Sequence, residues 1–451
     1  MTQIAGGRGE SHAAVRVPSG GAAAVIRRAS SLAFGFPGAH AFNALLSIVF
    51  VIVQTLIFSR VFDAKAFAQA IAAGAIGMYF LPINQSVARA NFVLLRGRVI
   101  NDEGGSDVPE AAAAFQASQA FFLVVVVVAP VLIGATDLYE YVWLAFFLVS
   151  VTYSNIWYSE MQMAMLATGR AMQFEMLTLV RRVLSFFILA YLFSLRDILS
   201  FSVLAGMQAL AFHIYFLRIV GRDAQLFNWP RGLTSLAMHA HLWRLWASLQ
   251  ATLAEWLTLN APYAVFMARF GIGPGLIALD AAMKLVRIVV SAIRNLCEIV
   301  LPRVSRAVFS GQGSSARLEV VSVLVLGLCG AGMAAAAVYF FQGLTFGFLL
   351  GPNNTVPEGA GAPIAVAILF SVFFATAGHL LGHTGRNAAI RAFMLIALAA
   401  IATSSVLIIF GELSINGALW AMAGALGVIS GTGLLLLRKM LNDQHQVGST
   451  T

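Results

Sequence analysis

The chain is dominated by apolar runs of about 20 residues, the length that an α-helix needs to cross the hydrocarbon core of a bilayer. Twelve such runs occur, separated by charged or Gly/Pro-rich segments. Hydrophobic residues make up 60% of the sequence and charged residues 10%, a balance that soluble domains do not have. The pattern predicts an all-α polytopic membrane protein. The predicted spans are 39–59, 66–88, 113–135, 138–160, 173–194, 197–218, 243–268, 274–301, 318–343, 361–382, 388–411 and 414–437.

The distribution of basic residues predicts the orientation of these spans. The net charge is +9, with 28 Lys and Arg residues. With a cytoplasmic amino terminus, 19 of them fall in cytoplasmic segments and four on the opposite side. Because Lys and Arg favour cytoplasmic loops, both termini are predicted to be cytoplasmic. Membrane anchoring therefore accounts for the basic charge, and no nucleic-acid partner is expected.

Weak internal repetition predicts two halves with the same orientation. Thr168-Gly169-Arg170 closes the fourth run, and Thr384-Gly385-Arg386 closes the tenth. Parallel repeats of this kind are related by an axis along the membrane normal. The predicted organisation is a disordered cytoplasmic tail without a signal peptide, a six-helix half, a cytoplasmic linker, a second six-helix half and a cytoplasmic tail. Their ranges are 1–38, 39–218, 219–242, 243–438 and 439–451.

The eighth run combines membrane length with one charged stripe. At roughly 100° per residue, six of its polar positions fall within about 40° of one line. They are Asp280, Lys284, Arg287, Ser291, Arg294 and Glu298. A charge at mid-bilayer costs roughly 2.5–3.5 kcal/mol, so the stripe is expected to face a polar cavity inside a helix bundle. A cationic cavity in a membrane implies an anionic cargo.

Several segments resemble one transporter superfamily. The turn Ser59-Arg60-Val61-Phe62-Asp63, the segment 301–305 (Leu-Pro-Arg-Val-Ser) and the segment 348–352 (Phe-Leu-Leu-Gly-Pro) occur in the order and spacing of its motifs. Together with Gly-Arg after spans four and ten, they resemble the multidrug/oligosaccharidyl-lipid/polysaccharide (MOP) exporters, in particular the polysaccharide (Wzx-type) flippases. The resemblance covers about residues 39–440.

The resemblance implies about twelve helices in two six-helix halves around a central cavity, a MATE/MOP-like fold. It also implies a multi-pass protein of the bacterial inner membrane, with no cofactor, that works by alternating access. Its cargo would be an undecaprenyl-diphosphate-linked glycan moved from the cytoplasmic to the periplasmic leaflet. The further partners that it implies are membrane lipids, H⁺ or Na⁺, and a polysaccharide polymerase complex.

The candidate substrate-binding residues are the basic side chains within spans, together with one amide. Lys284 and Arg287 lead because they lie near mid-span, and Arg suits phosphate with a fork of donors. The alternative is that Asp280–Lys284 merely satisfies charge as an i,i+4 pair. The full set is Lys284, Arg287, Arg294, Arg182, Arg181 and Asn84. Arg294 could instead pair with Glu298, one of the two span-five arginines could face away from the cavity, and Asn84 could serve helix packing.

Two carboxylates are candidate ion-coupling groups. Glu255 lies near the middle of the seventh span, and Asp280 lies on the charged stripe. An intramembrane carboxylate is functional by default, but an ion pair of Glu255 with Arg287 or Lys284 is the stronger expectation. Asn260 is expected in the same polar lining.

The remaining patterns argue against other functions. His379 and His383 have i,i+4 spacing but no third ligand, and both cysteines (Cys297, Cys329) lie in apolar runs, so no metal site or disulfide framework is predicted. There is no Walker motif and no catalytic constellation, so no enzyme is expected. The alternatives kept open are a MATE-like ion-coupled drug or small-molecule antiporter, a membrane glycosyltransferase and an assembly scaffold. A basic cavity disfavours cationic drugs.

Overall fold

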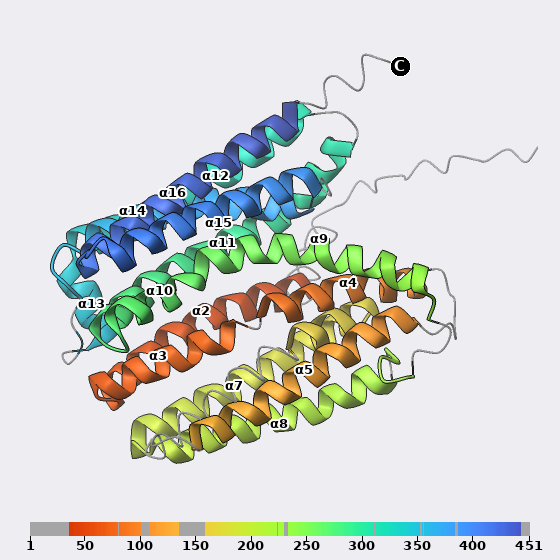
Figure 1. The fold of residues 1–451 in the computed structure, drawn as a ribbon, viewed down its shortest axis with the longest axis horizontal. Coiled ribbons are helices and arrows are strands. Elements are labelled where there is room, and N and C mark those ends of the chain that lie inside the picture. Colours follow the sequence, from red (N-terminus) through yellow and green to blue (C-terminus); the bar gives the residue numbers. More distant parts are fainter. Residues whose placement is uncertain are drawn as a thin grey trace, which may run out of the picture.

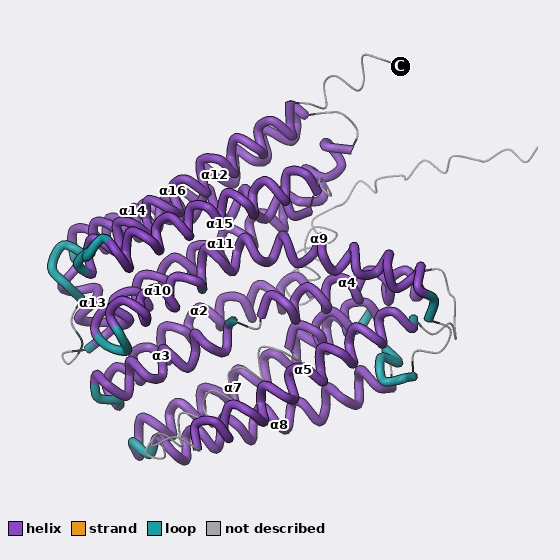
Figure 2. The backbone as a smooth tube through the Cα atoms, in the orientation of Figure 1, coloured by secondary structure: helices purple, strands orange, loops and turns teal. Residues whose placement is uncertain are grey.

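The computed structural model describes residues 36–79, 81–100, 108–134, 158–222, 224–229, 233–309, 313–351, 354, 356–383 and 387–442. Nearly all of these residues are helical (Figure 2). The helices are α2 (Phe36–Val61), α3 (Ala64–Met78), α4 (Leu81–Ile100), α5 (Pro109–Gly134), α7 (Ala171–Leu195), α8 (Ile198–Arg222), α9 (Ser235–Leu259), α10 (Ala261–Phe270), α11 (Pro274–Phe309), α12 (Gly313–Phe340), α13 (Gln342–Leu350), α14 (Gly361–His383), α15 (Asn387–Phe410) and α16 (Ile415–Asn442). A further helical stretch covers 158–167.

Eight helical stretches among the described residues are long and apolar enough to cross a membrane. They are Gly38–Val61, Ala64–Arg96, Ala171–Leu195, Ile198–Ile219, Ala316–Phe340, Gly361–Gly382, Ala388–Phe410 and Ile415–Asn442. The predicted membrane class is therefore confirmed, while the number twelve stays a prediction. Most of the expected span 138–160 lies outside the described residues, as do the tail residues 1–35 and 443–451. Within the range 219–242 expected for the linker, α8 ends at Arg222 and α9 begins at Ser235.

The helices form two groups that face each other (Figure 1). One contains α11, α12, α14, α15 and α16, and the other contains α2, α5, α7 and α8. Between them α4 packs against α9, and α3 packs against α11. We call the side on which α2 begins and α16 ends the inner side, and the opposite side the outer side, following the orientation predicted from charge. Many large apolar side chains are exposed on the surface of the protein, as expected for contact with lipid.

Two proline breaks divide membrane-spanning helices and meet between the two groups. Pro82 has no N–H to donate to Met78 O, and the helix breaks between α3 and α4. Trp256 Nε1 of α9 donates to that carbonyl instead at 3.1 Å. The second break separates α9 from α10 just before Pro262. Broken helices within a membrane are tolerated where protein groups or a cavity satisfy the freed backbone.

On the outer side, α2 is tied to α13 through backbone carbonyls. Ser59 Oγ donates to Leu349 O at 3.1 Å, and Arg60 Nη2 donates to Phe348 O at 2.9 Å. Asp63 then begins α3, because its carboxylate accepts a hydrogen bond from Ala66 N at 2.7 Å. The turn at Ser59–Asp63, which resembles a motif of the MOP exporters, therefore connects α2 to α13 on the outer side.

Candidate functional site

A cavity of about 560 Å³ lies between the two helix groups. Its walls come from α2, α3, α7 and α8 on one side and from α11 with Tyr263 of α10 on the other. Four basic side chains and one acidic side chain line it: Arg181, Arg182, Lys284, Arg287 and Asp280. The cavity therefore carries an excess of positive charge contributed by both halves of the chain.

Arg287 is held by the break between α9 and α10. Tyr263 N bonds to Asn260 O at 3.1 Å, so Leu259 O is left without its usual helical donor. Arg287 Nη2 donates to this freed carbonyl at 3.0 Å and to Asn260 Oδ1 at 2.7 Å. Both acceptors are neutral, so these two bonds position the arginine without pairing its positive charge with a carboxylate. Asn260 was expected in the polar lining; it hydrogen-bonds to Arg287 but is not among the residues that line the cavity.

Lys284 and Asp280 form the predicted i,i+4 pair on the same helix. Lys284 Nζ lies 2.6 Å from Asp280 Oδ2, and the buried Tyr263 hydroxyl donates to Asp280 Oδ1 at 2.9 Å. The Tyr263 ring also lies 5.2 Å from the Arg287 guanidinium. Tyr263 therefore organises both charged positions, and sequence reasoning missed it. The available signal was the Asn-Ala-Pro-Tyr interruption of an apolar run.

The opposite wall carries both span-five arginines. Arg182 Nη2 donates to Ser47 Oγ at 2.7 Å, and its guanidinium lies 4.7 Å from the Phe50 ring. Arg181 lies 4.3 Å from the Tyr158 ring. The sequence left open that one of the two would point away, but both line the cavity. Ring faces attract these cations without neutralising them.

Arg294 and Glu255 lie outside the cavity lining and pair with each other. Arg294 Nη2 is 2.5 Å from Glu255 Oε2, across the α9–α11 contact. The expected pairing of Glu255 with Arg287 or Lys284 was wrong, because its partner is Arg294. The reason is the break at Asn260, which gives Arg287 neutral backbone and amide acceptors. Glu255 on α9 instead lies beside Arg294, which is seven residues after Arg287 on α11.

Asn84 does not line the cavity either. Its side chain is fully buried beside α5 and the 158–167 stretch. His379 lies within electrostatic range of Glu255, and the side chain of His383 is outside the described part of the structure. Among the described residues, no group of three or more His, Cys, Asp or Glu side chains could hold a metal ion.

A second polar cluster lies directly on the inner side of the cavity. His40 Nδ1 is 2.9 Å from Glu175 Oε1, and its Nε2 is 3.6 Å from Glu298 Oε2 of the other half. Asn43 Nδ2 donates to Glu175 Oε2 at 2.6 Å. Each of His40, Glu175 and Glu298 lies seven residues from a cavity-lining position on its own helix, two turns or about 10 Å away on the same face. The cluster bridges the two halves beneath the cavity.

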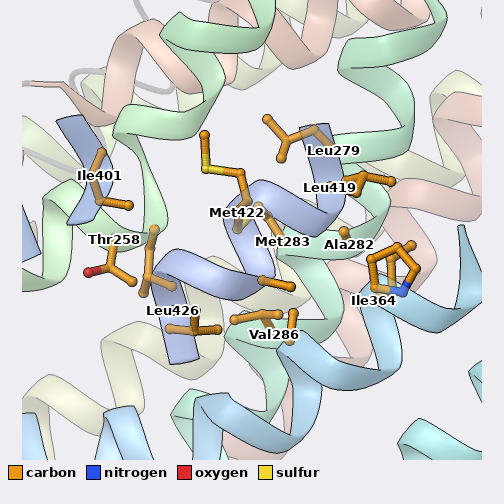
Figure 3. A pocket seen from close by; sticks show the side chains of 14 residues that line it. Thr258, Leu279, Ala282, Met283, Val286, Ile364, Ile401, Leu419, Met422 and Leu426 are labelled. Carbon is orange, nitrogen blue, oxygen red and sulfur yellow. The ribbon is translucent and has the colours of Figure 1, made fainter. Parts of the chain in front are cut away.

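A smaller cavity of about 20 Å³ lies inside the C-terminal helix group (Figure 3). Its lining is almost entirely apolar and includes Met283, Val286, Met422 and Leu426. The hydroxyl of Thr258 is used within its own helix, where it donates to Ala254 O at 2.8 Å. This space is a packing void, and the charged cavity is the candidate site.

Comparison with solved structures identifies the fold. A multidrug resistance MATE family transporter of the MOP superfamily, in an inward-facing conformation, superposes with a TM-score of 0.68 over 89% of this chain and 96% of its own, at 9% identity. The fold is MATE-like. A MOP superfamily transporter from Pyrococcus furiosus gives 0.59 over 89% and 93% at 10% identity, and the Vibrio cholerae MATE transporter VcmN gives 0.55 over 92% and 98% at 13%.

This similarity concerns the MATE-like fold alone, because all three identities are low. No protein-family profile and no curated protein matches the sequence. The expected MATE-like fold is therefore confirmed, while membership of the MOP superfamily and of its flippase branch stays a prediction.

Proposed function

We propose that this protein is a membrane transporter that moves an anionic, diphosphate-bearing lipid-linked glycan between leaflets by alternating access. The observation that carries the proposal is the excess positive charge of the cavity between its two halves. MATE-like architecture supplies the transporter context, since the similar solved structures are MATE and MOP transporters.

The arrangement of the basic groups suits a diphosphate. Arg287 and Arg182 donate hydrogen bonds to neutral acceptors, so these bonds pair neither guanidinium with a carboxylate. Guanidinium forks bind phosphate oxygens through paired N–H donors. The two arginines stand on walls from different halves. An anion held between them would draw those walls together, which is the coupling that alternating access requires.

Lys284 plays a different part in this proposal. Its pairing with Asp280 removes most of its field at long range. An incoming phosphate would compete with Asp280 for the ammonium, and Tyr263 would keep the displaced carboxylate hydrogen-bonded. Lys284 would then act as an exchangeable contact, whereas Arg287 is a permanent one.

One observation favours a second candidate, an ion-coupled small-molecule antiporter. The cavity volume of about 560 Å³ falls within the range of about 300–1,000 Å³ that is usual for small-molecule sites. A long glycan would have to extend beyond it. The Pyrococcus furiosus MOP transporter is itself described as having a binding pocket of reversed polarity that suggests a different function. For this chain, the basic lining would select a small anion rather than a cationic drug.

The test is a leaflet assay in vesicles that contain the purified protein. A fluorescent polyprenyl-diphosphate sugar on the inner leaflet is protected from a membrane-impermeant quencher until it is moved. We expect protein-dependent loss of protection, and loss of that activity in Arg182→Gln with Arg287→Gln combined. Transport of a small organic anion without lipid movement would support the antiporter and refute the flippase.

A further inference from the structure

Arg89 is an exposed basic residue on a part of α4 that is otherwise packed. The two residues on each side of it in the sequence are buried. A lipid-facing stripe would also expose the positions one turn earlier, but Gln85 is half-buried and Ser86 is buried. Helix α4 packs against α5 and against α9. The side chain of Arg89 therefore emerges at a local opening between packed helices.

This opening faces the C-terminal half. Arg89 lies within electrostatic range of Glu255 on α9 and of Arg294 on α11. The side chains of Arg294 and Glu255 are themselves partly accessible, at 32% and 29%. Arg294 lies seven residues after Arg287, about 10 Å further towards the inner side. The accessible space that Arg89 shares with Glu255 and Arg294 is therefore between the halves, on the inner side of the charged cavity.

The charge of Arg89 is not neutralised by the residues that the structure describes. The Glu255 carboxylate lies 2.5 Å from Arg294, and Arg89 makes neither an ion pair nor a hydrogen bond with any described residue. Glu175 and Glu298, which are also on the inner side, both contact His40. Two arginines thus share one carboxylate, and one positive charge remains in the space between the halves.

An anchoring role in the headgroup region is the simplest alternative for such an arginine. A basic side chain that anchors a helix extends along its lipid-facing surface to reach phosphate groups. The residues around Arg89 on α4 are packed, and the charged groups nearest to it belong to α9 and α11. A position between the two halves fits a residue that meets an anion on its way to the cavity.

We infer that Arg89 recruits the anionic headgroup of the cargo from the inner side and speeds its entry into the cavity. This inference rests on the proposed function, in which a diphosphate enters from the cytoplasmic leaflet. Arg89 does not line the cavity, and a single exposed charge adds little to affinity. Its field extends about 10 Å at 0.1 M salt, which matches the separation of about 10 Å between the levels of Arg294 and Arg287. A charge in this position acts on the association rate.

The test is the rate of binding of radiolabelled inorganic pyrophosphate to the purified full-length protein, measured by rapid filtration. At low ionic strength, we expect the association rate constant to fall about three- to tenfold in Arg89→Gln, and the dissociation rate constant to stay within about twofold of the wild type. The matched control is Arg196→Gln, which removes one exposed positive charge at the outer end of α7. Its association rate should stay within about twofold of the wild type.

Charge and salt separate recruitment from a structural role. Arg89→Lys keeps the charge and should keep the wild-type association rate, whereas the difference between Arg89→Gln and wild type should vanish near 1 M salt, where the screening length is about 3 Å. Arg89→Met retains an unbranched stem and is the second neutral variant if Arg89→Gln does not fold.

The outcomes distinguish this inference from the proposed function. Normal pyrophosphate binding with an unchanged association rate in both neutral variants would overturn the recruiting role and leave the cavity proposal intact. A slower rate that persists at high salt, or an equal loss in Arg196→Gln, would overturn the role as well. Absence of pyrophosphate binding in the wild type would overturn the anionic cavity and the recruiting role together.

Discussion

Arg287→Gln provides the sharpest test of the anionic cavity. In the structure, Nη2 of Arg287 is used for Leu259 O and Asn260 Oδ1, while the guanidinium has five N–H donors in total. The remaining donors can bind a phosphate. A hydrogen bond between charged groups contributes about 1.5–3 kcal/mol, so loss of one such contact should weaken diphosphate binding roughly 10- to 150-fold.

The assay is equilibrium binding of inorganic pyrophosphate to the purified protein at constant ionic strength, since screening would otherwise change the result. Arg294→Gln is the matched control. It is the same substitution on the same helix, but it breaks the pair with Glu255 outside the cavity. We expect the control to lower thermal stability while leaving the affinity within about threefold of the wild type.

Two results would refute this reasoning. Wild-type affinity in Arg287→Gln would show that the cavity charge does not bind the anion. Equal loss of affinity in both variants would show that general destabilisation, rather than the position of Arg287, explains the effect.

Three further predictions concern stability and pH. Removing Glu255 alone (Glu255→Gln) should destabilise the protein by about 1–3 kcal/mol, and adding Arg294→Gln should recover part of the loss in a double-mutant cycle of thermal unfolding. Gly433→Val should lower the melting temperature and the free energy of unfolding, the latter by about 1–3 kcal/mol, because even a Cβ at Gly433 would lie 2.7 Å from a ring carbon of Phe393. An unchanged melting temperature would contradict this packing. Ser200 donates hydrogen bonds to Asp197, just before α8, and these lower the pKa of the Asp197 carboxyl. The stabilisation of the folded state by this carboxylate is therefore fully present above the ordinary Asp pKa and is lost as the pH falls through the lowered value. Asp197→Ala should therefore differ from the wild type by a constant amount in melting temperature between about pH 5 and 8, and convergence within that range would count against the cap.

The helical membrane class and the charged stripe followed from the sequence because they depend on local composition and period. A 20-residue apolar run in a bilayer forms a helix, because its backbone N–H and C=O groups must hydrogen-bond to each other in the absence of water. The i,i+4 spacing of Asp280 and Lys284 likewise determined their pairing. The presence of Lys284 and Arg287 in a polar cavity agrees with the cost of leaving such charges in lipid, although their role in binding stays a prediction.

The breaks in two spans were harder to place. Pro82 and Pro262 were visible in the sequence, but both predicted spans continued through them because hydropathy averages over the interruption. Only the packing of α9 against α4 brings Trp256 to the carbonyl that Pro82 leaves free. The same kind of break supplies the carbonyl that holds Arg287.

The sequence by itself determined which segments are apolar helices, which helix faces carry charge, and that the charge requires an interior location. The tertiary structure decided how charges on different helices pair: Glu255 with Arg294, His40 with Glu175 and Glu298, and neutral partners for Glu160. The physical reason is range. Helical period and hydropathy act between residues a few positions apart, whereas an ion pair between helices depends on their axial offset and rotation, which the packing of the whole bundle sets.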